Sequence, residues 1–171
     1  MRHHHPSNKS IHLLTEKPGY GELLSPYFQT LSEEQAAWAS EDYDRNMKYP
    51  EHLKHKASSG NMVRSKSEVL IDHILTTNKI PFRYECALEL DGTILYPDFT
   101  ILHPRTNKIY YWEHFGMMDK EFYNKNVGSK LQTYISHGII PSIDLITTYE
   151  TDIHPLDISG LEMIVQEYFL D

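Results

Sequence analysis

Cysteine is nearly absent from this chain. Only one of its 171 residues, Cys86, is a cysteine, which excludes an internal disulfide and a zinc site built from several cysteines, and suits a reducing compartment. No apolar run approaches the roughly 20 residues that a membrane-spanning helix needs. The first residues also lack the apolar stretch of a secretory signal. We therefore expect a cytoplasmic protein that has no membrane partner.

Basic residues are outnumbered, with 16 Lys and Arg against 24 Asp and Glu, so the formal net charge is -8. Nucleic acids bind basic surfaces, and the balance argues at first sight against such a partner. The charges are unevenly spread, however. Six bases and one acid lie between Arg45 and Lys66, whereas the residues from Leu131 onward contain seven acids and no Lys or Arg. The basic segment is either a solvated loop or a surface for phosphates.

The length fits one domain with a small appendage. The aromatic content of 12% excludes a chain that is disordered throughout. We predict an N-terminal extension over residues 1–60, irregular except for a helix at about 32–45. A basic arm at 45–66 leads into the main domain, residues 61–171. The reason for the boundary is a run of small and polar residues, Ser58–Asn61, that favours a turn.

The main domain shows a regular succession of helix and strand patterns. Ser65 and Glu68 form a capping box at the start of a helix, and Asp91-Gly92 is a strong signal for a two-residue hairpin. The expected elements are a helix from Ser65 to about Asn78, strands at Tyr84–Leu90, Thr93–Leu102 and Lys108–His114, a helix at about Asp119–Ser136, a short strand at Ile143–Thr147 and a helix at about Ser159–Phe169. The predicted order is α-β-β-β-α-β-α.

Two carboxylates stand out by their position in this pattern. Asp98 follows Pro97 in the second expected strand, and Glu113 follows the aromatic run Tyr110–Trp112 in the third. Short turns join the strands, so we expect antiparallel neighbours with the two carboxylates side by side. A carboxylate in an apolar stretch needs a cation, because burying a lone charge is costly. Mg²⁺ or Mn²⁺ suits such oxygen ligands; the alternative for Glu113 is an ion pair with Arg or Lys.

These residues carry a resemblance. Glu68 on a helix, Pro97-Asp98 in a strand and Glu113 in the next strand resemble the PD-(D/E)XK nuclease superfamily. Stretches similar to uncharacterised bacterial members are Arg64–Glu68, Pro97–Thr100 and Trp112–Gly116. The resemblance covers about residues 62–150. It implies an α/β, restriction-endonuclease-like αβββαβ core, in which a mixed central sheet is flanked by helices. It also implies metal-dependent hydrolysis of DNA.

The chain departs from the pattern of that superfamily at one position. The lysine expected two residues after the strand acid is replaced by Phe115. Some members carry this lysine on the following helix, and Lys130 is the corresponding residue here. Tyr134 lies one helical turn further on the same face, a spacing similar to the helix motif of the exonuclease-like branch. Lys120 is a weaker substitute, and His114 is a further candidate for proton transfer.

Other charged residues have two interpretations each. The resemblance implies that Glu68 is a third acid near the metal; the residue pattern alone makes it the last member of the capping box. Arg64 and Lys66 precede the helix and are either phosphate ligands or solvated charges. Lys54 and Lys56 extend this basic segment, along which we expect DNA to approach.

Glu85 is predicted to be the partner of a basic residue on a strand face. The acidic portion from Leu131 onward is expected to face away from the nucleic acid.

Three functions from different classes remain open at this level. The first is a Mg²⁺-dependent phosphodiesterase acting on DNA through Glu68, Asp98, Glu113 and Lys130. The second is a nucleic-acid-binding module of the same fold without activity, because the strand lysine is missing. The third is a protein-interaction domain of a mobile-element or defence system that uses its acidic surface. Many nucleases of this superfamily form homodimers, but no residue pattern here marks a dimer face.

Overall fold

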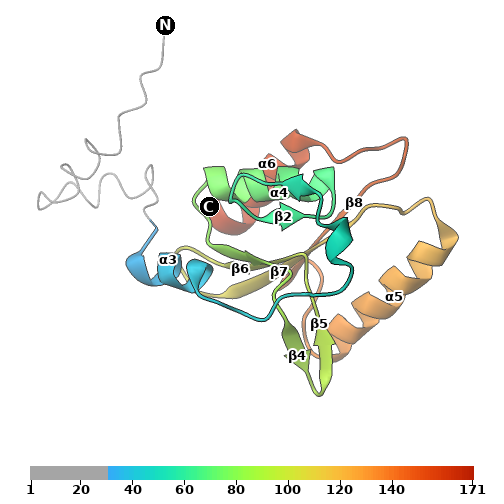
Figure 1. The fold of residues 1–171 in the computed structure, drawn as a ribbon, viewed down its shortest axis with the longest axis horizontal. Helices are drawn as coiled ribbons and strands as arrows, with labels where there is room; N and C mark the ends of the chain where they lie inside the picture. The colour runs from blue at the N-terminus through green and yellow to red at the C-terminus, as the bar shows by residue number, and fades with distance from the viewer. Residues whose placement is uncertain (1–30) are drawn as a thin grey trace, which may run out of the picture. The chain divides into compact units, whose positions relative to one another are not determined.

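A four-stranded mixed sheet lies at the centre of residues 31–171, the part of the chain that the computed structural model describes (Figure 1). Its order is β3 (Phe82–Tyr84), β6 (Phe99–Leu102), β7 (Ile109–Phe115) and β8 (Leu145–Tyr149). Strands β3, β6 and β7 pair antiparallel, and β8 pairs parallel to β7. With four α-helices in the described residues, this confirms the expected mixed α/β class. Half of the predicted extension, residues 1–30, lies outside the described part.

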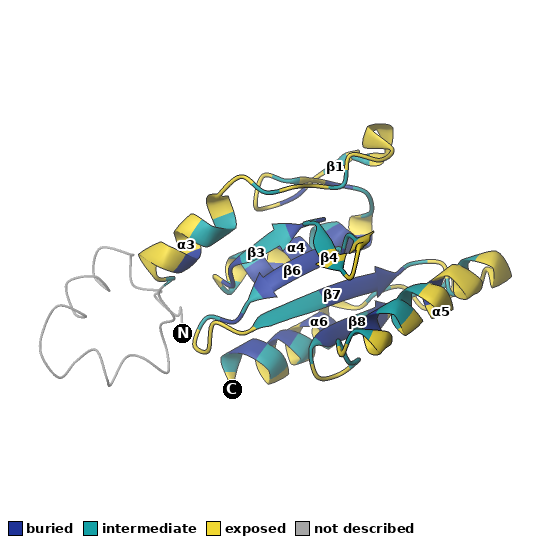
Figure 2. Ribbon diagram, turned by 90° about the horizontal axis from the view of Figure 1, so that it is seen from below, coloured by how far each residue is buried: buried dark blue, intermediate teal, exposed yellow. Residues whose placement is uncertain are grey.

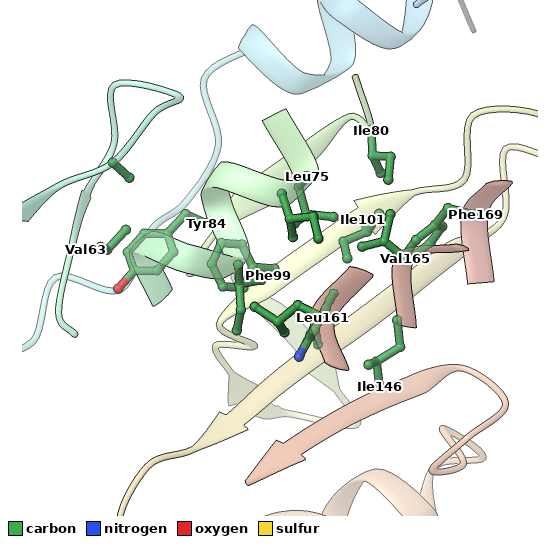
Figure 3. Close-up of a cluster of buried hydrophobic side chains, with 14 residues drawn as sticks. Val63, Leu75, Ile80, Tyr84, Phe99, Ile101, Ile146, Leu161, Val165 and Phe169 are labelled. Atoms are coloured by element: carbon green, nitrogen blue, oxygen red, sulfur yellow. The ribbon is translucent and has the colours of Figure 1, made fainter. Parts of the chain in front are cut away.

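Helices cover the sheet on both faces. Helices α4 (Lys66–Thr77) and α6 (Ile158–Val165) lie side by side over one face, and α5 (Glu121–Ser136) lies over the other (Figure 1). The core beneath α4 and α6 contains Leu75, Phe99, Ile101, Trp112, Ile146, Leu161 and Val165, and most of these side chains are seen converging in Figure 3. Helix α5 is much more exposed, with Val127 and Tyr134 as its buried residues (Figure 2).

The N-terminal part of the described chain is fastened to the edge of β3. Helix α3 (Glu33–Ser40) begins with a capping box formed by Ser32 and Gln35 but ends well short of residue 45. The reason is that the following residues bond β3 and the residues after it: the Tyr43 hydroxyl bonds the backbone of Tyr84, Ala87 N donates to Asp44 O, and Arg45 forms an antiparallel bridge with Cys86. These bonds satisfy an otherwise open strand edge, which competes with continued helix.

Residues 50–63 form a short 3₁₀ turn (Pro50–His52) and a hairpin of β1 (His55–Lys56) and β2 (Met62–Val63). Ala57 and Val63 belong to the main core. Residues 50–60 therefore pack with the residues that follow them, and the expected boundary at 60/61 falls in the hairpin turn.

Each of the first two expected strands is divided in two. Residues Leu88–Leu90 (β4) and Thr93–Leu95 (β5) form a separate hairpin beside the main sheet. Asp91 and Gly92 occupy its turn with φ of 46° and 84°, as the hairpin signal predicts. The break after β3 occurs at Glu85, whose φ is 46°. A residue in this conformation ends the pleat and redirects the chain.

The remaining elements match the expectations closely. Helices α4 and α5 and strands β7 and β8 occur within a few residues of the predicted limits. The expected last helix is α6 followed by a π-helical turn at Gln166–Leu170. Across residues 31–171, every helix is too short or too polar to serve as a bilayer-spanning segment.

Candidate functional site

Asp98 and Glu113 come together on the face of the sheet that α5 covers. Phe99 pairs with Trp112 in the antiparallel register of β6 and β7, so Asp98 lies opposite Glu113 at the next position. Strand alternation turns both side chains away from the α4 face on which Phe99 and Trp112 pack. The backbone N of His114 donates a hydrogen bond of 2.7 Å to Asp98 Oδ2. The adjacency expected from the sequence is therefore present.

Helix α5 contributes a cation and a phenol to this pair. Lys130 Nζ lies 2.7 Å from Glu113 Oε2, and the Tyr134 hydroxyl donates to Glu113 Oε1 at 2.5 Å. The Glu113 side chain is 2% exposed, whereas that of Lys130 is 30% exposed. Phe115, at the position of the missing strand lysine, is buried, and its ring lies 5.4 Å from that of Tyr149. The helix spacing thus brings both predicted residues to the same carboxylate.

The electrostatics of this group are dominated by burial of negative charge. Burial and the neighbouring Glu113 carboxylate raise the pKa of Asp98 well above its usual range, and Lys130 offsets only part of this. Burial likewise raises the pKa of Glu113 against the opposing effects of Lys130 and Tyr134. For Lys130, burial alone would lower the pKa, but the charges of Glu113 and Asp98 outweigh it and raise the pKa. The site has one cation for two acids.

Glu68 performs the capping role and also lies near the carboxylate pair. The Ser65 hydroxyl accepts from Glu68 N, and Glu68 Oε2 accepts from Ser65 N, which completes the capping box. The same oxygen accepts from Arg64 N and from the Tyr84 hydroxyl, each at 2.7 Å. The charge of Glu68 contributes to the raised pKa of Asp98. The two interpretations of this residue are therefore compatible.

The His114 ring lies on the opposite face of β7 from Glu113. Its Nδ1 is 3.0 Å from Thr148 Oγ1. Its Nε2 lies 3.2 Å from Glu150 Oε1. Only the backbone of His114 touches the candidate site. Lys120 is also elsewhere, because its ammonium pairs with Asp119 at 2.7 Å.

Arg64 is occupied by the protein itself. Its Nε lies 2.7 Å from Glu85 Oε1, so the ion pair expected for Glu85 is confirmed. The remaining nitrogens of the guanidinium donate to the carbonyls of Tyr49 and Lys48, both at 2.8 Å. The pair is largely buried, with side chains 19% and 9% exposed. The structure thus places Arg64 in a structural cluster that joins residues 48–49 to the sheet.

We expect Arg64→Ala to lower the free energy of unfolding by about 2–3 kcal/mol, because it leaves the carboxylate of Glu85 buried without its partner. Chemical denaturation at neutral pH measures this change. Lys56→Ala is the matched control, since its exposed side chain should alter stability by less than about 0.5 kcal/mol. Equal stabilities of the two variants would contradict the structural role of Arg64.

The other basic candidates are exposed. Lys54 precedes β1, Lys56 is its last residue, and Lys66 is the first residue of α4. Glu150 belongs to the acidic portion that we expect to face away from the nucleic acid. It follows β8 and approaches the ring of His114, on the opposite face of β7 from Glu113. Parallel pairing of β7 and β8 causes this, because it brings their carboxyl ends to one edge.

The donor set suits a hard divalent cation held partly by water and substrate. Mg²⁺ is commonly bound through one or two carboxylates together with phosphate oxygens, rather than by a complete protein cage. Asp98 and Glu113 supply two carboxylates with an excess of negative charge. Among residues 31–171, no three His, Cys, Asp or Glu side chains form a ready-made ligand cluster. The two carboxylates are oxygen ligands of the kind that Mg²⁺ or Mn²⁺ takes.

Two tyrosines near the site were not singled out as functional from the sequence. The Tyr123 hydroxyl accepts from Gly116 N at 3.3 Å, and its pKa is raised by burial and in part by Asp98. Tyr84 holds Glu68 from β3. The signal for Tyr123 was its place on the same helical face as Val127, Lys130 and Tyr134. Tyr84 offered no such signal, because its bond to Glu68 depends on the packing of α4.

Comparison of the chain with models of protein families, with curated proteins and with solved structures finds no match.

Proposed function

We propose that this chain is a metal-dependent nuclease that hydrolyses phosphodiester bonds in DNA, built on a restriction-endonuclease-like core of the PD-(D/E)XK type. The order of α4, the antiparallel strands, α5 and the parallel strand β8 supports this assignment. The observation that carries it is the approach of Lys130 Nζ to Glu113 at 2.7 Å beside Asp98. An acid pair next to a helix-borne ammonium is the constellation that a displaced catalytic lysine requires.

Each residue of the constellation has a chemical task. Asp98 and Glu113 would hold Mg²⁺ or Mn²⁺, which polarises the scissile phosphate and makes a bound water more acidic. The Lys130 ammonium would orient the attacking water or stabilise charge that develops on the phosphate oxygens. Tyr134 holds Glu113 through its hydroxyl and keeps the carboxylate turned toward Lys130.

The proposal predicts that the purified full chain cleaves DNA in Mg²⁺ or Mn²⁺ and does not cleave it in EDTA. Supercoiled plasmid, linear duplex and single-stranded DNA should be incubated separately, so that gel patterns also separate cuts within a strand from digestion at ends. Lys125→Ala, an exposed change on α5, should cleave like the unchanged chain. Cleavage that persists in EDTA, or no cleavage of any substrate in either metal, would contradict the proposal.

A binding module without activity is the second candidate. Its support is that both oxygens of Glu113 already have partners, Lys130 and Tyr134, and that no three-ligand cluster occurs within the described residues 31–171. Binding of DNA without cleavage in every metal would favour it over the nuclease.

A further inference from the structure

Tyr49 is an exposed aromatic residue in an unusual backbone conformation. Its φ of 53° and ψ of 57° lie in the left-handed region, which bulky L residues rarely adopt. The residue is 63% exposed, and its ring stacks on His52 with centroids 5.5 Å apart and planes 15° apart. Packing in a core does not explain this conformation. Strain maintained at an exposed position is a reason to look for a ligand.

Hydrogen bonds from Arg64 stabilise this backbone conformation. Arg64 donates to the carbonyls of Tyr49 and Lys48, and its ion pair with Glu85 ties both to the end of β3. The backbone N of Glu85 in turn donates to Asp98 O at 3.0 Å. Residues 47–56, which we call the Tyr49 loop, are therefore connected to the backbone of Asp98 through Arg64 and Glu85.

The charge of the Tyr49 loop is positive and open to solvent. Lys48, Lys54 and Lys56 are exposed, and Glu51 is the only acid between residues 45 and 66. No carboxylate of residues 31–171 forms an ion pair with these three lysines. A flat ring that exposes part of its surface among several ammonium groups combines the two elements by which proteins bind unpaired nucleic acid strands.

We infer that the Tyr49 loop binds an unpaired stretch of nucleic acid, with one base stacked on the Tyr49 ring and the adjacent phosphates on the lysines. This rests on the proposed function and names the substrate class: the strand that reaches Asp98 and Glu113 is single-stranded. In a duplex the base faces are covered by their neighbours, so an isolated ring on a loop has no base to stack on. Single-stranded DNA and RNA share the recognised chemistry, and the assay distinguishes them.

The test is the binding of fluorescently labelled 12-mers to the full chain in EDTA, measured by anisotropy. The probes are a single DNA strand, the same sequence as RNA and the corresponding DNA duplex. Tyr49→Ala should weaken binding of the preferred single strand by about 10-fold and change duplex binding by less than twofold. Tyr49→Phe keeps the stacking face and should stay within about threefold of the unchanged chain.

Two further variants make the result specific. Phe122→Ala removes another exposed aromatic residue, on α5, and should leave all binding unchanged. The double change of Lys54 and Lys56 to Ala should weaken single strands and duplex alike and flatten the salt dependence. Equal affinity for duplex and single strands, insensitivity to Tyr49→Ala, or an equal loss in Phe122→Ala would each overturn the inference. Because binding is measured without metal, a lack of cleavage would reject the nuclease and leave this result standing.

Discussion

Asp98→Asn is expected to abolish cleavage and to leave a protein at least as stable as the unchanged chain. The carboxylate is one of two that would hold the metal, and loss of such an interaction is worth several kcal/mol, or roughly 10³-fold in rate. The amide oxygen of Asn can still accept the hydrogen bond from His114 N that Asp98 Oδ2 accepts at 2.7 Å. The local backbone should therefore keep its structure while the chemistry is lost.

The effect on stability follows from the raised pKa of Asp98. A carboxyl whose pKa is higher in the folded state than the ordinary value of about 4 binds its proton more tightly when folded. The fold then loses stability as the pH rises from that ordinary value through the folded pKa. In Asp98→Asn the carboxyl is absent, so this loss of stability with rising pH does not occur. In metal-free buffer we expect the free energy of unfolding of Asp98→Asn to be about 1 kcal/mol higher than that of the unchanged chain at pH 7. The difference should shrink toward pH 4.

Paired measurements separate the two effects. Denaturation in EDTA at several pH values gives the stabilities, and single-turnover cleavage in Mg²⁺ gives the rate. Asp91→Asn is the control, because that carboxylate is exposed at the hairpin turn and should change neither quantity appreciably. Cleavage that survives Asp98→Asn would remove this residue from the active site. The prediction would also fail if the stability of Asp98→Asn, relative to the unchanged chain, were lower at pH 7 than at pH 4. That result would show that the Asp98 charge is compensated in the fold.

Local signals in the sequence predicted the parts of the site that depend on periodicity. The adjacency of Asp98 and Glu113 followed from short turns between neighbouring strands. Spacing placed Lys130 and Tyr134 on one face of a helix, whereas the meeting of that face with Glu113 was expected only from the resemblance to the nuclease superfamily. His114 was a poorer choice as a site residue. Because side chains alternate along a strand, a residue directly after Glu113 points to the opposite face.

Contacts between distant segments could not be predicted in this way. The alternating pattern continues through Glu85 without interruption, yet the strand breaks there because Arg64 binds its carboxylate and residues 44–46 bond the backbone around it. The same cluster converts Arg64 from an expected phosphate ligand into an anchor. Such roles depend on which segments meet in three dimensions, and a single sequence contains no local signal of that meeting.

Lys130→Met is expected to cost stability as well as activity. It leaves Glu113, only 2% exposed, with Tyr134 as its remaining partner. Removing one member of a fully buried ion pair costs about 3–5 kcal/mol. Because the Lys130 side chain is 30% exposed, we expect a smaller loss of about 2–3 kcal/mol. Denaturation at pH 7 measures the loss, and Lys125→Met, on the exposed side of the same helix, should lose less than about 0.5 kcal/mol.

Combining Lys130→Met with Glu113→Gln separates the structural role of the pair from its chemistry. In the double variant Glu113 has no charge that needs Lys130, and Asp98 loses the repulsion of Glu113 together with the attraction of Lys130. Its stability should therefore return to within about 1 kcal/mol of the unchanged chain, with a coupling energy above about 1.5 kcal/mol. Its cleavage should stay absent, because both a metal ligand and the ammonium are gone. Recovery of stability without recovery of cleavage is the outcome expected of an active site. Additive losses of stability would contradict the 2.7 Å contact between Lys130 and Glu113, and a double variant that still cleaves DNA would place the chemistry elsewhere.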